Sequence, residues 1–416
     1  MSLLKPYKQR KLLFLEIALL SLMVLSLPSL EAPKNIFLVL FVGVAILRQL
    51  KTINLKVWGG WDWMFLAILV SAFLSTVFAG LSPGDEWKGF RVLLTFIGAG
   101  WLVSRSAYST KEIAWIFWII IFSAIPPLFY GLWEFLIILT KDSLELHSVG
   151  HTNHTAIYLT MIFGAALGAS LSFWRSSSNL QKIILFVLPV IFYLSLIVTS
   201  SRAAFAVGTI ISGILIYLLS SNKKEMLQSA LIILMLFSGT IFLNAPILQK
   251  QISNQNNRDV LAGRGVIWNT TIEAANLHPI LGIGIDNRAN VTKDIIKKSI
   301  EARHGEFNED NYDFHYKHSH SFYLTNIAER GLVGSLVTLV FIFMWLWYLI
   351  KTFYITRLSN EGAYLWAGSL SAWCATFVIG FVNTTFHHEH GILACLFLGL
   401  HLAFLNKKGL KLKKSF

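Results

Sequence analysis

The sequence predicts an all-α membrane protein that crosses the bilayer about twelve times. Of its 416 residues, 55% are hydrophobic and only 14% are charged, and the mean hydropathy is +0.60. A water-soluble domain cannot cover its surface with so few charges. The chain also contains many uncharged runs of about 20 residues, the length that a helix needs to span the hydrocarbon. We therefore expect a single membrane domain over residues 1–416.

Twelve apolar runs, bounded by charges, proline or glycine, are the predicted spans. The first follows a basic segment, as in a signal peptide, but Leu30, Glu31 and Ala32 lack the small-residue cleavage pattern, so we expect an uncleaved helix. Cys374 and Cys395 lie inside spans, where a thiol is usually a small core residue, and no disulfide is expected. The runs are residues 12–29, 35–48, 62–81, 90–104, 113–138, 155–174, 184–200, 204–221, 226–245, 332–350, 364–384 and 391–405.

The basic residues indicate the topology. With the N-terminus in the cytoplasm, every cytoplasmic loop is basic, as in most inner-membrane proteins. An even number of spans then returns the C-terminus to the cytoplasm. The net charge of +13 does not indicate a nucleic acid partner, because the basic residues form short clusters between apolar runs and not one continuous face. The clusters are Lys5, Lys8, Arg10 and Lys11; Arg48, Lys51 and Lys56; Arg105 and Lys111; Arg175 and Lys182; Lys223 and Lys224; Lys351 and Arg357; and Lys407, Lys408, Lys411, Lys413 and Lys414.

One long hydrophilic stretch, residues 246–318, interrupts the apolar runs on the periplasmic side of this topology. Unstructured connections of such length are uncommon, so we expect it to carry function or short helices. Residues 265–277 have the pattern of an amphipathic helix, and residues 292–303 also look helical. Gly282-Ile-Gly284 indicates a turn between them. Residues 304–317 are polar and aromatic, and we expect them to be flexible.

All histidines except His401 fall on the periplasmic side of this topology or at that membrane edge. Imidazole is the side chain best suited to proton transfer near neutral pH, and polar groups at a membrane boundary are costly unless they are used. The competing interpretation is that these histidines merely tolerate a wet edge. The residues concerned are His147, His151, His154, His278, His304, His315, His318, His320, His387, His388 and His390.

Two arginines are candidates for binding a pyrophosphate. Arg202 occupies a short turn between two apolar runs, and Arg264, six residues after Arg258, opens the predicted amphipathic helix. A guanidinium group binds phosphate through two parallel hydrogen bonds, and helix N-terminal amides add to the attraction. The alternative for Arg202 is snorkelling to lipid phosphates. Lys88 and Arg91 lie near the outer end of the fourth span, where snorkelling is the simpler explanation.

The pair His318-Ser-His320, with Ser321 after it, stands just before the tenth predicted span, which opens with Gly331 and Gly334. On a helix, positions two apart point about 200° from each other, so we expect only one of these histidines to act. The turn His387-His388-Glu389-His390 is a source of a carboxylate that would orient the catalytic imidazole. A metal site is the rival interpretation, although no run has the spacing of zinc hydrolases.

Four motifs together resemble the O-antigen ligase and polymerase superfamily of bacterial envelope glycosyltransferases. Their order and spacing match from about residue 195 to 335, whereas the first 190 residues match only in hydropathy. The last motif is closest to the ligase branch. The motifs are Thr199-Ser-Ser-Arg202-Ala, Gly263-Arg264-Gly-Val-Ile-Trp268, His278-Pro-Ile-Leu-Gly282-Ile-Gly284 and His320-Ser321-x9-Gly331-x2-Gly334.

The resemblance implies a metal-independent enzyme of the Gram-negative inner membrane that uses no cofactor. It would move a glycan from undecaprenyl pyrophosphate to the lipid A core at the periplasmic face, among membrane lipids. His320 would be the general base, and Arg202 and Arg264 would bind the pyrophosphate. The further candidates for substrate binding are His318, Arg258, His151, His154, His388 and Glu389.

Three other activities remain compatible with these residues. An O-antigen polymerase would use a second lipid-linked glycan as the acceptor. A protein O-oligosaccharyltransferase would use a serine or threonine, but that branch tends to carry an extra C-terminal region that is absent here. A lipid-linked oligosaccharide flippase would also have about twelve spans, with charges inside several of them, whereas the charges here gather at one face.

Overall fold

The computed structural model describes residues 4–50, 58–141, 143–243, 263–357 and 360–409. Within these ranges the chain forms helices and no strand, which confirms the predicted all-α class. The long helices are α1 (Leu4–Ser26), α2 (Glu31–Gln49), α3 (Gly60–Val77), α4 (Glu86–Arg105), α5 (Thr110–Ser123), α6 (Ile125–Trp133), α7 (Thr152–Phe173), α8 (Asn179–Val198), α9 (Arg202–Leu219), α10 (Lys223–Leu243), α12 (Arg264–Leu277), α13 (Lys293–Ala302), α14 (Phe322–Arg357), α15 (Asn360–Phe377) and α16 (His388–Lys407).

Among the described residues, eight helical segments are long and apolar enough to cross a membrane. They contain α3, α5 with α6, α7, α8, α9, α14, α15 and α16. The remaining predicted runs lie in α1, α2, α4 and α10, which are helical but not among these eight. Every predicted run thus corresponds to a helix, and the total of about twelve spans stays a prediction.

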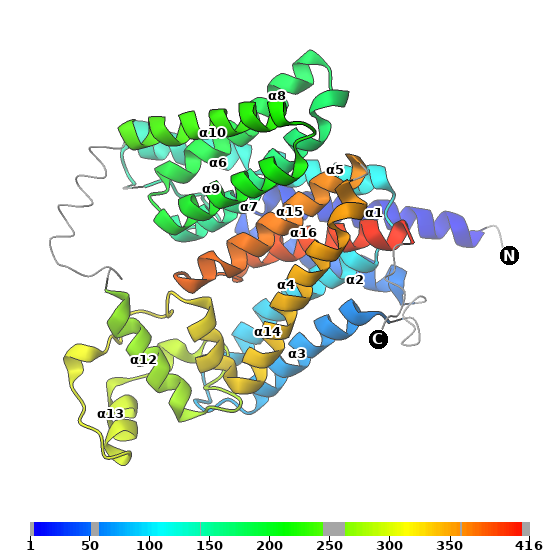
Figure 1. Ribbon diagram of the computed structural model, residues 1–416. Coiled ribbons are helices and arrows are strands. Elements are labelled where there is room, and N and C mark those ends of the chain that lie inside the picture. Colours follow the sequence, from blue (N-terminus) through cyan, green and yellow to red (C-terminus); the bar gives the residue numbers. More distant parts are fainter. Residues whose placement is uncertain (1–3, 51–57, 142, 244–262, 358–359, 410–416) are drawn as a thin grey trace.

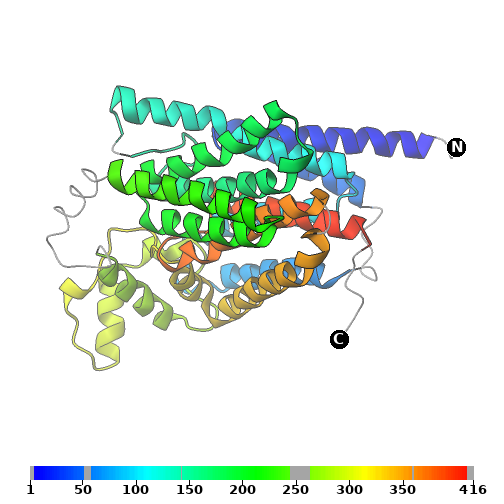
Figure 2. The same cartoon turned by 45° about the horizontal axis from the view of Figure 1, so that its top comes forward.

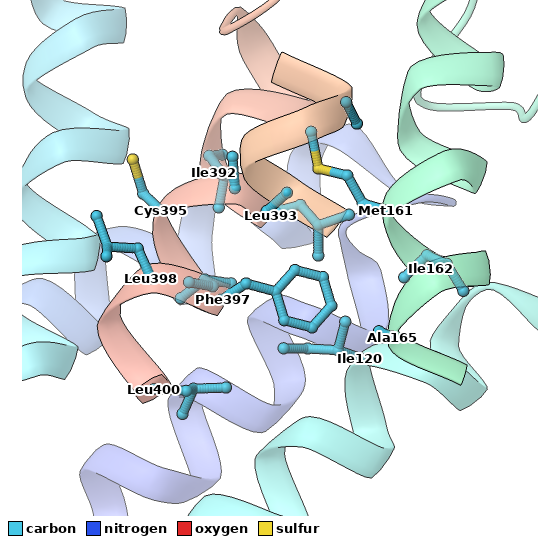
Figure 3. Close-up of a cluster of buried hydrophobic side chains, with 14 of the residues drawn as sticks. Ile120, Met161, Ile162, Ala165, Ile392, Leu393, Cys395, Phe397, Leu398 and Leu400 are labelled. Atoms are coloured by element: carbon cyan, nitrogen blue, oxygen red, sulfur yellow. The ribbon is translucent and has the colours of Figure 1, made fainter. Parts of the chain in front are cut away.

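The core of the bundle is built around α7, α15 and α16, which are the most deeply buried of the eight candidate spans. Phe397 of α16 lies between Ile120 of α5 and the α7 face that carries Met161 and Ala165 (Figure 3). Small residues let the backbones approach, since a β-carbon on Gly168 of α7 would lie 2.1 Å from that of Ala367. Such small-residue contacts are the usual basis of helix packing in lipid.

The stretch from α12 to α13 forms a smaller body at one end of the bundle (Figures 1 and 2). The helices α12 and α13 confirm the two predicted helices of residues 265–277 and 292–303. A separate apolar cluster joins them through Ala274, Ile296 and Ile300. Asp313 exchanges two hydrogen bonds with Thr270, of 2.9 and 3.0 Å, which ties the segment expected to be flexible to α12 at this point.

The tenth predicted run begins directly after a break in α14. The helix starts ten residues earlier, at Phe322, and breaks at Gly331, where φ is +59° and ψ is −163°. The first part of α14 was not predicted. The loop before the short helix η4 (Asn287–Asn290) pairs with the backbone on both sides of this break. Ile283 N donates to Ala328 O over 2.9 Å, and Leu332 N donates to Pro279 O over 2.8 Å. The loop therefore satisfies backbone groups that the broken helix leaves without partners.

The helices of the bundle run in both directions, so each side of the bundle holds the first residues of some helices and the last residues of others. The N-terminal end of α1 and the C-terminal end of α16 lie on the same side, away from α12 and α13 (Figure 1). The first residues of α7, α9, α14 and α16 therefore face the other end, where α12 also begins. We call this the histidine end, because residues 147–154, 318–320 and 387–390 lie there.

Candidate functional site

Arg202 is the first residue of α9, directly after the tight turn that ends α8. Ser200 in this turn has φ +57°. Thr152, at the start of α7, donates from its Oγ1 atom to the carbonyl oxygen of Thr199 over 2.6 Å, which fixes the turn against the bundle. The exposed Arg202 side chain thus stands beside a helix N-terminus, a position that favours anions.

Arg264 is the first residue of α12, and Gly263 before it has φ +77°. Burial lowers the pKa of the Arg264 guanidinium, and the charge of Arg202 lowers that pKa further. The two predicted arginines, which are 62 residues apart in sequence, are therefore close enough to repel each other. A bound anion with several negative charges would relieve this repulsion. Arg258, the third predicted arginine, lies outside the described residues.

The segment around His318 and His320 is not helical, so the expectation based on helical spacing does not apply. Ser319 between them is fully buried and donates from Oγ to Ser321 O over 2.7 Å, while Ser321 N donates back to the same Oγ over 3.1 Å. His320 adopts φ +51°. This turn sends His318 toward His387, at 5.3 Å between ring centroids, and His320 toward Tyr316, at 5.5 Å.

Burial lowers the pKa of His320 to about 4, with a further contribution from the positive charge of Arg264. Burial also lowers the pKa of His318. Both imidazoles are therefore neutral at physiological pH, the form that accepts a proton. A base of so low a pKa is weak, but an anion bound by Arg264 would neutralise the nearby cation and raise the pKa of His320.

The predicted histidines His151 and His154 at the start of α7 meet the turn before α16. The ring of His154 lies 6.1 Å from that of His387 and 5.1 Å from that of His390. His388, with φ +41°, lies 3.7 Å from His387 between ring centroids. The fold thus gathers at the histidine end imidazoles from three segments that the sequence separates widely.

The structure also bears on the predicted alternative of a metal site and on two further histidines, His278 and His315. Over the ranges that the structure describes, no three His, Cys, Asp or Glu side chains are arranged to hold a metal ion. His315 is exposed near Asp313, with 3.7 Å between Nδ1 and Oδ2. His278 packs against the backbone of Gly80, where a β-carbon would lie 2.0 Å from the ring. These two histidines have contacts of their own, away from the turn before α16.

Glu389, predicted to orient an imidazole, forms an ion pair with Lys34 of α2. Both side chains are buried, with 7% and 6% of their surface exposed. A charge buried at this depth requires a partner, so Lys34 and Glu389 hold α2 and the start of α16 together. Sequence reasoning missed Lys34, because the two residues are 355 positions apart. Lys34 lies at the first turn of an apolar run, which was the only local signal.

A cavity of about 220 Å³ opens next to these histidines. Its walls come from α3, α4, α14, the loop before α13 and the turn before α16. His318, His387, His388, Lys88 and Asp286 are among the residues that line the cavity. The two predicted arginines do not line it. Of the cavity's charged residues, sequence reasoning had singled out only Lys88, as a snorkelling residue, and had missed Asp286, Glu329 and Arg330.

The fold and the site define a multi-pass membrane protein with histidines and arginines gathered at one end of its helical bundle. Residues 184–339 match the family model described as O-antigen ligase. This match agrees with the resemblance that the motifs carry, and the matched segment contains Arg202, Arg264 and His320. The match indicates a function of the O-antigen ligase or polymerase type, among glycosyltransferase-like membrane enzymes. No curated protein matches the chain.

Proposed function

We propose that this protein is an O-antigen ligase, which transfers a glycan from undecaprenyl pyrophosphate to a sugar of the lipid A core. The observation that carries the proposal is the convergence of His320, Arg202 and Arg264, from three separate segments, at one end of the bundle. A reaction with a pyrophosphate leaving group needs one base and concentrated positive charge, and these residues supply both.

In the proposed reaction, an acceptor hydroxyl oxygen attacks the anomeric carbon of the donor glycan. The bond between that carbon and the pyrophosphate oxygen breaks, and undecaprenyl pyrophosphate leaves with the electron pair. His320 takes the hydroxyl proton, a contribution of about 10²–10⁴-fold in rate. Arg202 and Arg264 stabilise the charge that builds on the departing pyrophosphate, which is usually the largest electrostatic contribution.

The approach of the pyrophosphate also prepares the base. Arg264 contributes to the low pKa of His320 in the protein without substrate. Once the anion is bound, its two negative charges offset the charges of Arg202 and Arg264, and the pKa of His320 rises from its lowered value. The base is therefore strengthened only when the donor is in place, so an unproductive deprotonation without donor is disfavoured.

A reconstituted reaction tests the proposal. The purified full chain in detergent, given undecaprenyl pyrophosphate-linked glycan and lipid A core, should form the glycan-bearing product without added nucleotide or metal. His320→Ala should bind the donor normally and lose nearly all transfer, whereas His318→Ala should retain more activity. Normal turnover by His320→Ala would refute the assignment of the base.

The same reaction separates the ligase from its rivals. An O-antigen polymerase would extend one lipid-linked glycan with another and ignore the lipid A core, and a protein O-oligosaccharyltransferase would require a peptide. A flippase would form no new glycosidic bond. Product on the lipid A core alone therefore distinguishes the ligase from all three.

We also propose that the histidine end faces the periplasm and that both termini are cytoplasmic in the bacterial inner membrane. This rests on the one-sided distribution of lysine and arginine in the loops. Reporter fusions after residues 53, 108, 178, 223 and 410 should give a cytoplasmic signal, and fusions at residues 143 and 300 a periplasmic one. A cytoplasmic signal at residue 300 would overturn the proposed function.

A further inference from the structure

The cavity beside the histidines contains buried polar atoms that lack partners. Within the described chain, Nε of Arg330, Oγ1 of Thr384 and Nδ1 of His387 have no hydrogen-bond partner, and all three residues line the cavity. Arg330 is 6% exposed and Thr384 is 8% exposed. Buried polar atoms are nearly always paired, so unpaired atoms in three residues that line one cavity favour a polar ligand there.

Asp286 stands at the rim in a strained conformation. Its φ is +65°, and its backbone N donates to Oε2 of the buried Glu329 over 3.0 Å. Its carboxylate lies 3.4 Å from Nζ of Lys88, which is also 3.9 Å from the carboxylate of Asp85. Strain of this kind persists only where the surroundings enforce it, and it gathers at ligand sites. The fold therefore holds Asp286 in place in the lining of the cavity.

The charges around the mouth favour an uncharged ligand. Lys88 is shared between Asp85 and Asp286. The whole lining holds three acidic side chains, Asp85, Asp286 and Glu329, and three basic ones, Lys88, Lys317 and Arg330, so neither sign is in excess. The carboxylate and the ammonium group instead offer an acceptor and donors, which together suit neighbouring hydroxyl groups. The lining therefore offers no excess of positive charge to hold a phosphorylated or acidic sugar.

Part of the cavity lining is aromatic. Phe386 packs edge to face against Phe96, with 4.8 Å between ring centroids, and against Phe322, at 6.1 Å. All three residues line the cavity. Sugar rings combine hydroxyl groups at their edges with an apolar C–H face, so a lining with both polar and aromatic side chains matches this class of ligand.

The position of the cavity decides which substrate it serves. His318 lines it, and His320 lies two residues further on, whereas Arg202 and Arg264 are not among its walls. We propose that this cavity is the acceptor subsite and holds one uncharged sugar ring, next to the ring that receives the glycan. The inference rests on the proposed function, in which the donor pyrophosphate binds to Arg202 and Arg264. The acceptor must then approach His320 from elsewhere, and the cavity is next to it.

Two variants with matched controls test the subsite in the purified full chain. Asp286→Asn keeps a residue that tolerates positive φ but removes the carboxylate. Ala289→Trp adds bulk at an exposed position of the rim. Asp310→Asn and Ala302→Trp make the same changes at exposed positions outside the cavity. The loss of a hydrogen bond to a charged group predicts a KM for lipid A core about tenfold higher in Asp286→Asn, with an unchanged donor KM.

Direct binding provides a second readout that does not depend on transfer. The probe is core oligosaccharide freed of lipid A and of phosphate, and its contact with the protein is followed by saturation-transfer NMR. Wild type and both controls should bind it, and Ala289→Trp should not. Unchanged acceptor KM and unchanged binding in both variants would overturn the inference, as would a rise confined to the donor KM. Binding through the cavity without any transfer by wild type would refute the proposed function and support the subsite.

Discussion

Replacing Gly331 with alanine tests whether the break in α14 depends on close approach of two backbone segments. A β-carbon at Gly331 would lie 2.4 Å from the carbonyl carbon and oxygen of Ile280. With φ +59° and ψ −163°, the residue also occupies a region reserved almost entirely for glycine. Backbone strain of about 1–3 kcal/mol and overpacking of about 1–3 kcal/mol together predict that the free energy of unfolding falls by roughly 2–6 kcal/mol.

Thermal unfolding of the purified chain in detergent measures this effect. Gly43→Ala and Gly98→Ala are the matched controls, because a β-carbon at either helical position meets nothing within 4 Å. Alanine inside a helix is favoured over glycine by about 0.5–1 kcal/mol, so these controls should unfold no earlier than wild type. Gly331→Ala should unfold several degrees lower. Equal midpoints for Gly331→Ala and the controls would show that the loop and the broken helix do not depend on each other.

Three further outcomes follow from the site. Because the pKa of His320 is lowered to about 4 in the protein without substrate, kcat/KM for transfer should fall on the acidic side only near pH 4. The acidic limb of kcat should lie at higher pH, because bound pyrophosphate raises the pKa, and identical limbs would refute this coupling. Arg202→Lys and Arg264→Lys keep the positive charge but lose the paired donors of the guanidinium group. Each variant should insert normally and transfer glycan at least about tenfold more slowly. Wild-type rates in both variants would show that the two arginines only anchor the protein at the membrane surface. Lys34→Met should destabilise the protein by about 3–5 kcal/mol in chemical unfolding, because Glu389 is left buried without its partner, and Lys34→Met with Glu389→Leu should recover most of the loss.

The sequence predicts those features that depend on local composition. Each apolar run corresponds to a helix because a continuous apolar surface and internal backbone hydrogen bonds are what lipid requires of a segment. The helix of residues 265–277 was predicted from its periodic apolar face, and Arg264 does open it. The meeting of His154 with the turn before α16 was only suggested by topology, because loops on one side of a membrane are brought near each other in every bundle.

Other features depend on contacts between distant segments and leave little trace in local sequence. The tenth predicted run begins at residue 332, after the break in α14, and misses the first part of the helix, which contains Glu329 and Arg330. In the fold both charges are buried with specific partners, and Arg330 donates from Nη2 to Oγ of Ser71 over 2.8 Å. From local sequence alone, two adjacent charged residues indicate the end of a span, because their partners on another helix are not known. The ion pair between Lys34 and Glu389 could not be predicted for the same reason.

The turn at Gly282-Ile-Gly284 and the break in α14 at Gly331 together fix the position of Asp286. Gly284 N donates to the carbonyl oxygen of Glu329 at the break in α14, and the carboxylate of the same Glu329 accepts from the backbone of Asp286. The close approach of the loop to the break therefore fixes the strained rim residue of the cavity. Five of the seven non-glycine residues with positive φ in the described chain lie among the site and cavity residues or within two residues of one: Ser200, Asp286, His320, Phe386 and His388. Strain at so many neighbouring positions requires a rigid frame, and the packing at the glycines together with the buried ion pair provides it. Loosening that frame should thus misplace the base and the cavity rim together, although neither the glycines nor Lys34 is assigned any contact with substrate.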